Sequence, residues 1–173
     1  LMRVKTAGII EEDIEKGITK YAKPVGVVAA ISPSTNPAAT PVNKAMMAVK
    51  GGNAVIIAPS PAGLATTTAT VDYMRTELKK IGVPEDLVQV LPAPVNKELT
   101  QELMYQSDLI VCTGSQNNVK RAYSSGTPAI GVGAGNVPVI VDETADLIDA
   151  AIKIKESKCF DNSTSCSSEA SHS

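Results

Sequence analysis

Residues 26–58 read GVVAAISPSTNPAATPVNKAMMAVKGGNAVIIA, and this stretch determines the predicted fold. It begins with a short run of Val, Ala and Ile, which is typical of a buried strand. Pro37 then opens a segment with apolar residues at helical spacing, and Gly51-Gly52 marks its end. Residues 55–58 form a second apolar run. The order strand, helix, strand predicts a βαβ unit with parallel strands.

The same alternation continues along the rest of the chain. Further strands are predicted at 87–91, 109–112 and 137–141, and further helices at 62–81, 97–105, 116–123 and 145–158. Hydrophobic residues make up 43% of the chain but aromatic residues only 3%, so the core must consist of aliphatic side chains. Together these features predict an α/β fold: an open, mostly parallel, Rossmann-like sheet with helices on both faces.

Composition excludes several classes of function. The net charge is −2 and clusters of like charge are short, so no nucleic-acid partner is expected. Lys or Gly interrupts each apolar run before membrane-spanning length, and the first residues lack a signal-peptide core, so no membrane partner is expected. Three cysteines and one histidine without zinc-site spacing predict reduced thiols and no metal.

Ligands of open parallel sheets bind beyond the carboxyl ends of the strands, so residues just after each strand are site candidates. Between Thr113 and Ser115 a strand passes into a helix, where free N–H groups and the helix dipole favour an anion such as a pyrophosphate. An ordinary helix cap by Ser115 is the alternative. All the candidate segments are small, polar or turn-forming: Ser32 to Pro37, Pro59 to Pro61, Pro92 to Pro94 and Thr113 to Ser115.

The three cysteines differ in their surroundings. Cys112 lies inside a predicted buried strand and Cys159 ends a predicted helix, so both are interpreted as structural. Cys166 lies in a polar loop, where a thiol is either a nucleophile or an incidental loop residue. The glycines from Gly131 to Gly135 do not match a dinucleotide phosphate loop. They indicate a turn that serves either ligand contact or tight packing.

The order of these motifs resembles that of aldehyde dehydrogenases over nearly all of residues 20–169. The resemblance implies a nicotinamide-binding domain over residues 1–173 that ends just past a nucleophilic Cys166. Most of the second domain, which carries the rest of the aldehyde pocket and the oligomerisation surface, would be absent, and the full-length protein is expected to be a homo-oligomer. The motifs are Pro24-Val25-Gly26-Val27-Val28 with Pro33-Ser34-Thr35-Asn36-Pro37, Gly52-Asn53-Ala54-Val55-Ile56-Ile57 with Pro59-Ser60, Gly82-Val83-Pro84, Thr113-Gly114-Ser115 and the loop from Phe160 to Cys166.

The chain is more similar to the CoA-acylating branch of this family, which acts on aldehydes such as acetaldehyde, propionaldehyde, sulfoacetaldehyde and succinate semialdehyde, and includes the aldehyde half of bifunctional aldehyde–alcohol dehydrogenases. Hydrolytic members carry a Glu in the glycine-rich segment that activates water, whereas residues 131–135 contain no carboxylate. Without a base, water attacks a thioester slowly, while a CoA thiol needs less help. Ala58 stands where hydrolytic members have a Lys that holds the adenosine ribose.

The resemblance also implies roles for residues. The Cys166 thiolate would add to the aldehyde, and the Cys166 backbone N–H and the Asn36 amide would stabilise the oxyanion, with Thr35 as the alternative contact. Hydride would pass to NAD or NADP, and the acyl group to coenzyme A. The residues implied for cofactor binding are Ser32, Pro33, Thr35, Pro59, Thr113, Gly114, Ser115, Gly131 and Gly133.

The expected partners are therefore a small aldehyde and CoA, in the cytoplasm or in the lumen of a bacterial microcompartment. Three alternatives stay open at this point. They are a hydrolytic aldehyde dehydrogenase, an enzyme of the same fold that resembles glutamyl-phosphate reductase, and a folded fragment without catalysis.

Overall fold

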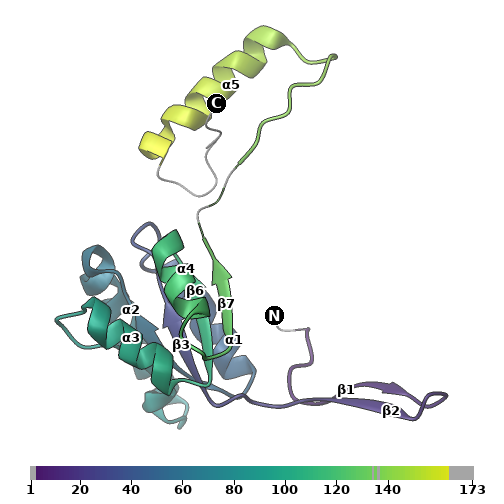
Figure 1. Cartoon of the computed structure of the whole chain (residues 1–173), viewed down its shortest axis with the longest axis vertical. Helices are drawn as coiled ribbons and strands as arrows, with labels where there is room; N and C mark the ends of the chain where they lie inside the picture. Colours follow the sequence, from purple (N-terminus) through teal and green to yellow (C-terminus); the bar gives the residue numbers. More distant parts are fainter. Residues whose placement is uncertain (1–2, 134, 136, 164–173) are drawn as a thin grey trace. The chain divides into compact units, whose positions relative to one another are not determined.

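A computed structural model describes residues 3–133, 135 and 137–163 of the chain (Figure 1). The chain divides into two compact units, Leu1–Gly131 and Val132–Ser173. Within the described residues, no helix has both the length and the apolar character needed to cross a membrane.

A five-stranded sheet forms the centre of the first unit, in the order β5–β4–β3–β6–β7. The pairs β3–β4, β4–β5 and β3–β6 are parallel. The chain leaves β3 on one side through β4 and β5 and returns on the other side through β6 and β7, so the strand order reverses between β3 and β6. The strands span Val27–Ile31 (β3), Ala54–Ala58 (β4), Val88–Val90 (β5), Leu109–Thr113 (β6) and Ala129–Val132 (β7).

Helices cover both faces of this sheet, which confirms the predicted fold. Val28 and Ala30 of β3 pack with α1 and α2 in one apolar cluster, whereas Ala29 and Ile31 pack with α3 and α4 in another. This alternation is the two-residue period of a strand that is buried on both faces. The helices span Ala39–Lys50 (α1), Leu64–Lys80 (α2), Lys97–Gln106 (α3) and Gln116–Tyr123 (α4), with short 3-10 turns at Pro61–Gly63 (η1) and Glu85–Leu87 (η2).

Polar side chains fix the amino end of β3. The Asn53 side-chain oxygen accepts hydrogen bonds from the N–H groups of Val25 and Gly26, at 2.6 and 3.1 Å. The Asp108 carboxylate accepts one from Val27 N–H at 2.7 Å. Gly26 has φ 123°, and an added Cβ there would collide with the Asp108 carboxylate, so this position requires glycine.

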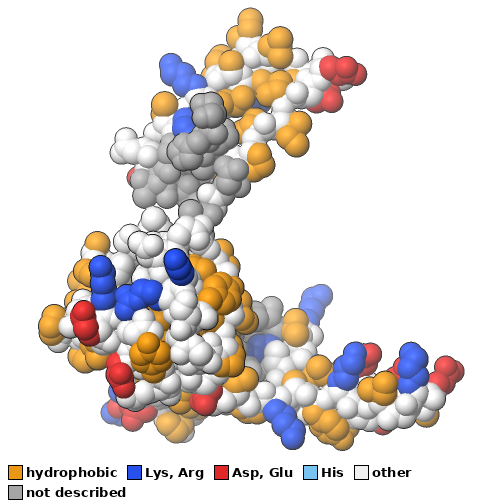
Figure 2. Space-filling view, in the orientation of Figure 1, with side chains coloured by type: hydrophobic (Ala, Val, Ile, Leu, Met, Phe, Trp, Pro, Cys, Tyr) orange, Lys and Arg blue, Asp and Glu red, His pale blue; other side chains and the backbone are white. Residues whose placement is uncertain are grey.

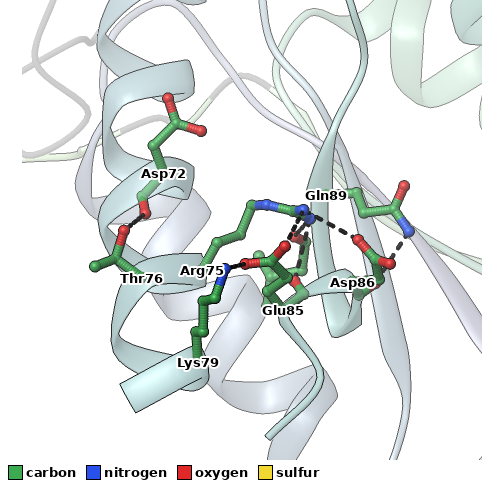
Figure 3. Close-up of polar contacts among 8 residues, drawn as sticks. Asp72, Arg75, Thr76, Lys79, Glu85, Asp86 and Gln89 are labelled. Carbon is green, nitrogen blue, oxygen red and sulfur yellow. Dashed lines mark hydrogen bonds and ion pairs between the residues drawn. The ribbon is translucent and has the colours of Figure 1, made fainter.

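Arg75 of α2 ties that helix to the segment that leads into β5 (Figure 3). Its guanidinium donates to the backbone carbonyls of Glu85 and Val88, each at 3.1 Å, and pairs with the Asp86 carboxylate at 3.0 Å. The ion pair lies at the surface and contributes little, so the two bonds to backbone carbonyls are the ones that hold the edge strand.

A β-hairpin near the start of the chain was not predicted. Strands β1 (Gly8–Asp13) and β2 (Ile18–Ala22) form a two-stranded antiparallel sheet. Because both faces of this hairpin meet solvent, its strands lack the one-sided apolar alternation that marks a half-buried strand. Figure 2 shows apolar side chains on the surface, and those of the hairpin with large exposed areas are Ile9, Ile10, Ile14, Ile18 and Tyr21.

The second unit contains helix α5 (Leu147–Cys159), followed by a 3-10 turn at Phe160–Ser163 (η3). The predicted helix at 145–158 is therefore confirmed, but the predicted strand at 137–141 is wrong, because those residues form no strand. The strand of this region is β7, which lies earlier in the chain and overlaps only the start of the glycine-rich segment, at Gly131 and Val132. Apolar composition at 137–141 suits a strand, but strand formation also requires a pairing partner, which local sequence does not reveal.

Candidate functional site

The loops after β3, β4 and β6 meet at one edge of the sheet, because these parallel strands end in register. The point between β3 and β6, where the strand order reverses, is where ligands of such sheets bind. The structure thus brings most of the predicted cofactor-binding residues to one edge: Ser32, Pro33, Thr35, Pro59, Thr113, Gly114 and Ser115.

Ser32 is the first residue after β3. Its backbone N–H donates to the Ala58 carbonyl at 2.9 Å, a bond that belongs to the last residue pair of the β3–β4 ladder, Ile31 with Ala58. Its side chain is buried, and its hydroxyl has no hydrogen-bond partner among the described residues. Leaving a buried hydroxyl unsatisfied costs about 1–3 kcal/mol. A polar atom of a bound cofactor would satisfy it, so this position fits the predicted role.

Asn36 lies in the exposed part of the same loop. Its side-chain oxygen accepts a hydrogen bond from the Ala39 N–H at 3.1 Å, at the start of α1. This contact orients the amide and leaves its nitrogen, which is the donating atom, for another partner. An oxyanion donor must present an N–H group, and this nitrogen has two. Thr35, the alternative contact, is also exposed.

Pro37 anchors the far end of the loop. Its carbonyl accepts a hydrogen bond from the Thr67 hydroxyl of α2 at 2.8 Å, and Thr67 is almost fully buried. A Cβ added at Gly63 would lie 2.8 Å from the Pro37 Cβ, so glycine at 63 allows the loops after β3 and β4 to pack closely. Neither Gly63 nor Thr67 was singled out from the sequence.

The segment from Thr113 to Ser115 joins β6 to α4. The Ser115 hydroxyl accepts a hydrogen bond from the Asn118 N–H at 3.3 Å, so the helix-cap interpretation of Ser115 is confirmed. Gly114 has φ 154°, and apart from its own chain neighbours no atom of the described residues lies within 4 Å of an added Cβ. That an anion binds at this helix start stays a prediction.

Lys44 of α1 is a buried residue of this edge that was missed in the sequence. Its ammonium donates to the backbone carbonyls of Ile31 and Val111, the latter at 2.9 Å, and its side chain is 5% exposed. Burial lowers the pKa of Lys44 from 10.5 to about 8, while the neighbouring Cys112 acts to raise it. An ammonium is thus held between the ends of two adjacent strands.

A signal for Lys44 was present in the sequence. The buried positions of α1 are Pro41, Lys44, Ala45 and Ala48, which is the spacing of one helix face. A lysine within such an apolar face is unusual, because Lys is almost never fully buried without partners. This pattern identifies Lys44 as a candidate, although only the structure reveals its two carbonyl partners.

The two described cysteines differ in burial. Cys112 of β6 is fully buried, and burial raises the pKa of its thiol, so its interpretation as a core residue is confirmed. Cys159, the last residue of α5, is exposed, so its interpretation as a structural residue is not supported by burial. Cys166, the predicted nucleophile, lies outside the described residues.

Close packing explains the glycine at 131. An added Cβ would lie 2.7 Å from Cγ1 of Val119 and 3.0 Å from Cε2 of Tyr123. The Tyr123 hydroxyl also accepts a hydrogen bond from Gly131 N–H at 3.0 Å. Of the two alternatives for the glycine-rich segment, tight packing therefore holds at Gly131. Cofactor contacts by Gly131 and by Gly133, which belongs to the second unit, stay predictions.

An open parallel sheet whose polar loops meet at its switch point is typical of α/β proteins that bind nucleotides and related ligands. Within that class, this chain belongs to the aldehyde dehydrogenase family, whose model matches residues 2–171.

Individual relatives narrow the comparison. Over 165 residues the chain is 59% identical to a sulfoacetaldehyde dehydrogenase (acylating) of Cupriavidus necator, a match that covers 95% of this chain and 34% of that protein. An acetylating aldehyde dehydrogenase from Geobacillus thermoglucosidasius superposes with a TM-score of 0.86 at 43% identity, over 96% of this chain and 37% of that one.

A propionaldehyde dehydrogenase of Rhodopseudomonas palustris, with bound CoA and an acylated cysteine, superposes with a TM-score of 0.76 at 36% identity, over 85% of this chain and 34% of that one. The chain spans about a third of the length of the curated relatives it matches.

Proposed function

We propose that this protein is an NAD- or NADP-dependent aldehyde dehydrogenase that transfers the acyl group to coenzyme A. The observation that carries the proposal is the pair of polar groups at the switch point, in a chain of this family. The Ser32 hydroxyl is buried without a partner among the described residues, and the Asn36 amide is held by its oxygen. One group suits a bound cofactor and the other a developing oxyanion.

The chemistry assigned to this chain begins at Cys166. Its thiolate forms a bond to the aldehyde carbon, and the carbonyl oxygen becomes an oxyanion that accepts a hydrogen bond from the Asn36 amide. Hydride would leave that carbon for a bound nicotinamide cofactor, which would supply the acceptor. The acyl group then passes from the Cys166 sulfur to the thiolate sulfur of CoA, and the Cys166 thiolate is released. Ser32, Pro59 and the segment 113–115 would hold the cofactor.

The glycine-rich segment indicates whether water or CoA accepts the acyl group. Residues 131–135 contain no carboxylate, and the Val132 side chain is 59% exposed. This segment therefore offers no general base to activate water against an acyl group on Cys166. Hydrolysis should be slow, and the acyl group should remain on Cys166 until a thiol attacks it. This distinguishes CoA transfer from the hydrolytic alternative.

The identity of 59% to an acylating sulfoacetaldehyde dehydrogenase makes sulfoacetaldehyde the first aldehyde to test, beside succinate semialdehyde and propionaldehyde. We further infer from the family resemblance that the protein works as a homo-oligomer in the cytoplasm or in a microcompartment.

A transient kinetic experiment on the full gene product tests the function. With aldehyde and NAD⁺ but without CoA, we expect a burst of NADH followed by a sharp slowing, and addition of CoA should restore steady turnover. Cys166→Ser should abolish the burst, whereas the control Cys159→Ser should retain it. Fast carboxylate production without CoA would assign the protein to the hydrolytic branch. Reduction of an acyl phosphate without CoA would favour the reductase alternative.

A second variant tests the missing base directly. Val132→Glu places a carboxylate on an exposed side chain, and general-base help is typically worth about 10²–10⁴-fold in rate. Gly131→Glu is unsuitable, because its side chain would meet Val119 and Tyr123. An increase in CoA-independent hydrolysis by Val132→Glu would support the absence of a base as the reason for CoA transfer.

A further inference from the structure

The Thr67 hydroxyl forms a contact that two other threonines of α2 do not form. Thr70 and Thr76 each donate to the backbone carbonyl four residues earlier in their own helix, at 2.8 Å. This is a common bond of a helical threonine. Thr67 instead donates to the Pro37 carbonyl, which lies 30 residues earlier in the chain, also at 2.8 Å. Its hydroxyl therefore links α2 to the loop after β3.

Packing alone does not require a hydroxyl at this position. The Thr67 side chain is 1% exposed, and a valine would fill nearly the same space with the same branched shape. A hydroxyl in such a place needs a hydrogen-bond partner, and the partner of Thr67 is a carbonyl of the candidate site. The hydroxyl thus serves the contact with Pro37.

Pro37 transmits this contact to Asn36. The ring of a proline fixes its φ at about −65°, and the residue before a proline is restricted towards extended backbone. Holding the Pro37 carbonyl therefore also limits the backbone of Asn36. The Asn36 side-chain oxygen is held separately, by the Ala39 N–H at 3.1 Å. The backbone and the amide of Asn36 are thus both constrained.

The other end of this loop is held by a different contact. Ser32 N–H donates to the Ala58 carbonyl at 2.9 Å, within the last residue pair of the β3–β4 ladder. Loss of the Thr67 hydroxyl should therefore release the end of the loop that carries Asn36 and leave Ser32 in place. The two ends have different expected roles, so an effect of Thr67 on oxyanion stabilisation can be separated from an effect on cofactor binding.

We propose that Thr67 is a positioning residue, which holds Asn36 through the Pro37 carbonyl at the place where the Asn36 amide donates to the oxyanion. The inference rests on the proposed function, in which Asn36 has that role. Thr67 acts through the backbone of the loop and is not itself assigned a contact with substrate or cofactor.

Thr67→Val in the full gene product tests this proposal, because Val keeps the branched shape and removes the donor. We expect the rate constant of the NADH burst, measured by stopped flow, to fall at least about tenfold, since small misplacements of a catalytic group cost up to about 10²-fold. The dissociation constant of the nicotinamide cofactor should stay within about twofold, because Ser32 remains held. Thr67→Ser retains the donor and should keep the burst rate within about threefold of the unmodified protein.

Thr70→Val is the matched control. It makes the same chemical change on the same helix but removes only a bond within α2, so the burst rate should stay within about twofold. Asn36→Ala then tests whether Thr67 acts through Asn36. Alone it should slow NADH formation by about 10²–10³-fold, as loss of an oxyanion donor does. In that background Thr67→Val should add less than about a twofold loss, because residues that act as a unit are not additive.

The outcomes are distinguishable from those of the proposed function. An unmodified protein that neither binds a nicotinamide cofactor nor oxidises aldehydes would reject the function itself. With an active unmodified protein, four results would overturn only the role of Thr67: an unchanged burst rate in folded Thr67→Val, a parallel loss of cofactor affinity, an equal loss in Thr70→Val, or a full further loss in the Asn36→Ala background. If Thr67→Val does not fold, the same measurements on Thr67→Ala decide.

Discussion

The buried ammonium of Lys44 should make the stability of the chain rise with pH between 7 and 9. The folded-state pKa of Lys44, about 8, lies below its ordinary value of 10.5. Between these values the unfolded chain retains a proton that the folded chain has released, so the free energy of unfolding increases with pH. Well below pH 8 both states are protonated, and the cost of burying the charge is present in full.

The magnitude follows from the two pKa values. Their difference, 10.5 − 8, corresponds to roughly 3 kcal/mol over the whole window, at 1.36 kcal/mol for each pKa unit. Between pH 7 and 9 the linkage relation assigns about 1.3 kcal/mol of that total. Cys112 acts in the opposite direction, because burial raises the pKa of its thiol and the unfolded chain loses that proton first.

The assay therefore uses Cys112→Ala as its background. Urea unfolding at pH 7, 8 and 9, followed by circular dichroism, should show a gain of at least about 1.3 kcal/mol with Lys44 present, because Cys112 no longer raises the pKa of Lys44, and almost none after Lys44→Met. Exposed groups titrate alike in both chains, so their contributions cancel. The same pH dependence in both chains would refute the reasoning, because the increase would then come from another group.

Two other predictions follow from described contacts. Gly26→Ala should lower the free energy of unfolding by more than about 2 kcal/mol, because it combines an unfavourable φ with a collision against the Asp108 carboxylate; a loss below about 0.5 kcal/mol in urea unfolding would contradict it. In native chain treated with iodoacetamide, peptide mapping should find exposed Cys159 modified and buried Cys112 protected until urea is added, with Cys166 expected to react fastest; equal rates at Cys112 and Cys159 would argue against the described burial.

Most of the sheet was predictable because its signals are local. Each buried strand is a short aliphatic run that ends at Gly, Pro or a polar turn, and α1 and α2 show helical spacing between such runs. The rule that ligands bind beyond the carboxyl ends then placed Ser32, Pro59 and Thr113 at one edge, and the register of the strands confirms that they lie there.

The features that were missed depend on partners distant in sequence. The hairpin of β1 and β2 has no buried face, so its sequence lacks the apolar alternation that predicts a half-buried strand. Strand β7 contains Gly131, where Val119 and Tyr123 pack in the space that a side chain would fill. A strand was predicted at residues 137–141 and not at β7. The role of Lys44 depends on two carbonyls on different strands, which no local pattern encodes.

Two unfavourable features of the fold occur at the same point. The Lys44 ammonium is buried beside the Ile31 carbonyl, and the next residue, Ser32, buries a hydroxyl without a partner among the described residues. Each costs the folded chain free energy that an apolar residue would not. Natural sequences violate the rules of core packing mainly at functional sites, where the polar group serves a ligand. Because both violations lie at the strand reversal between β3 and β6, where the fold alone predicts ligand binding, the packing of the core and the topology of the sheet independently indicate the same site.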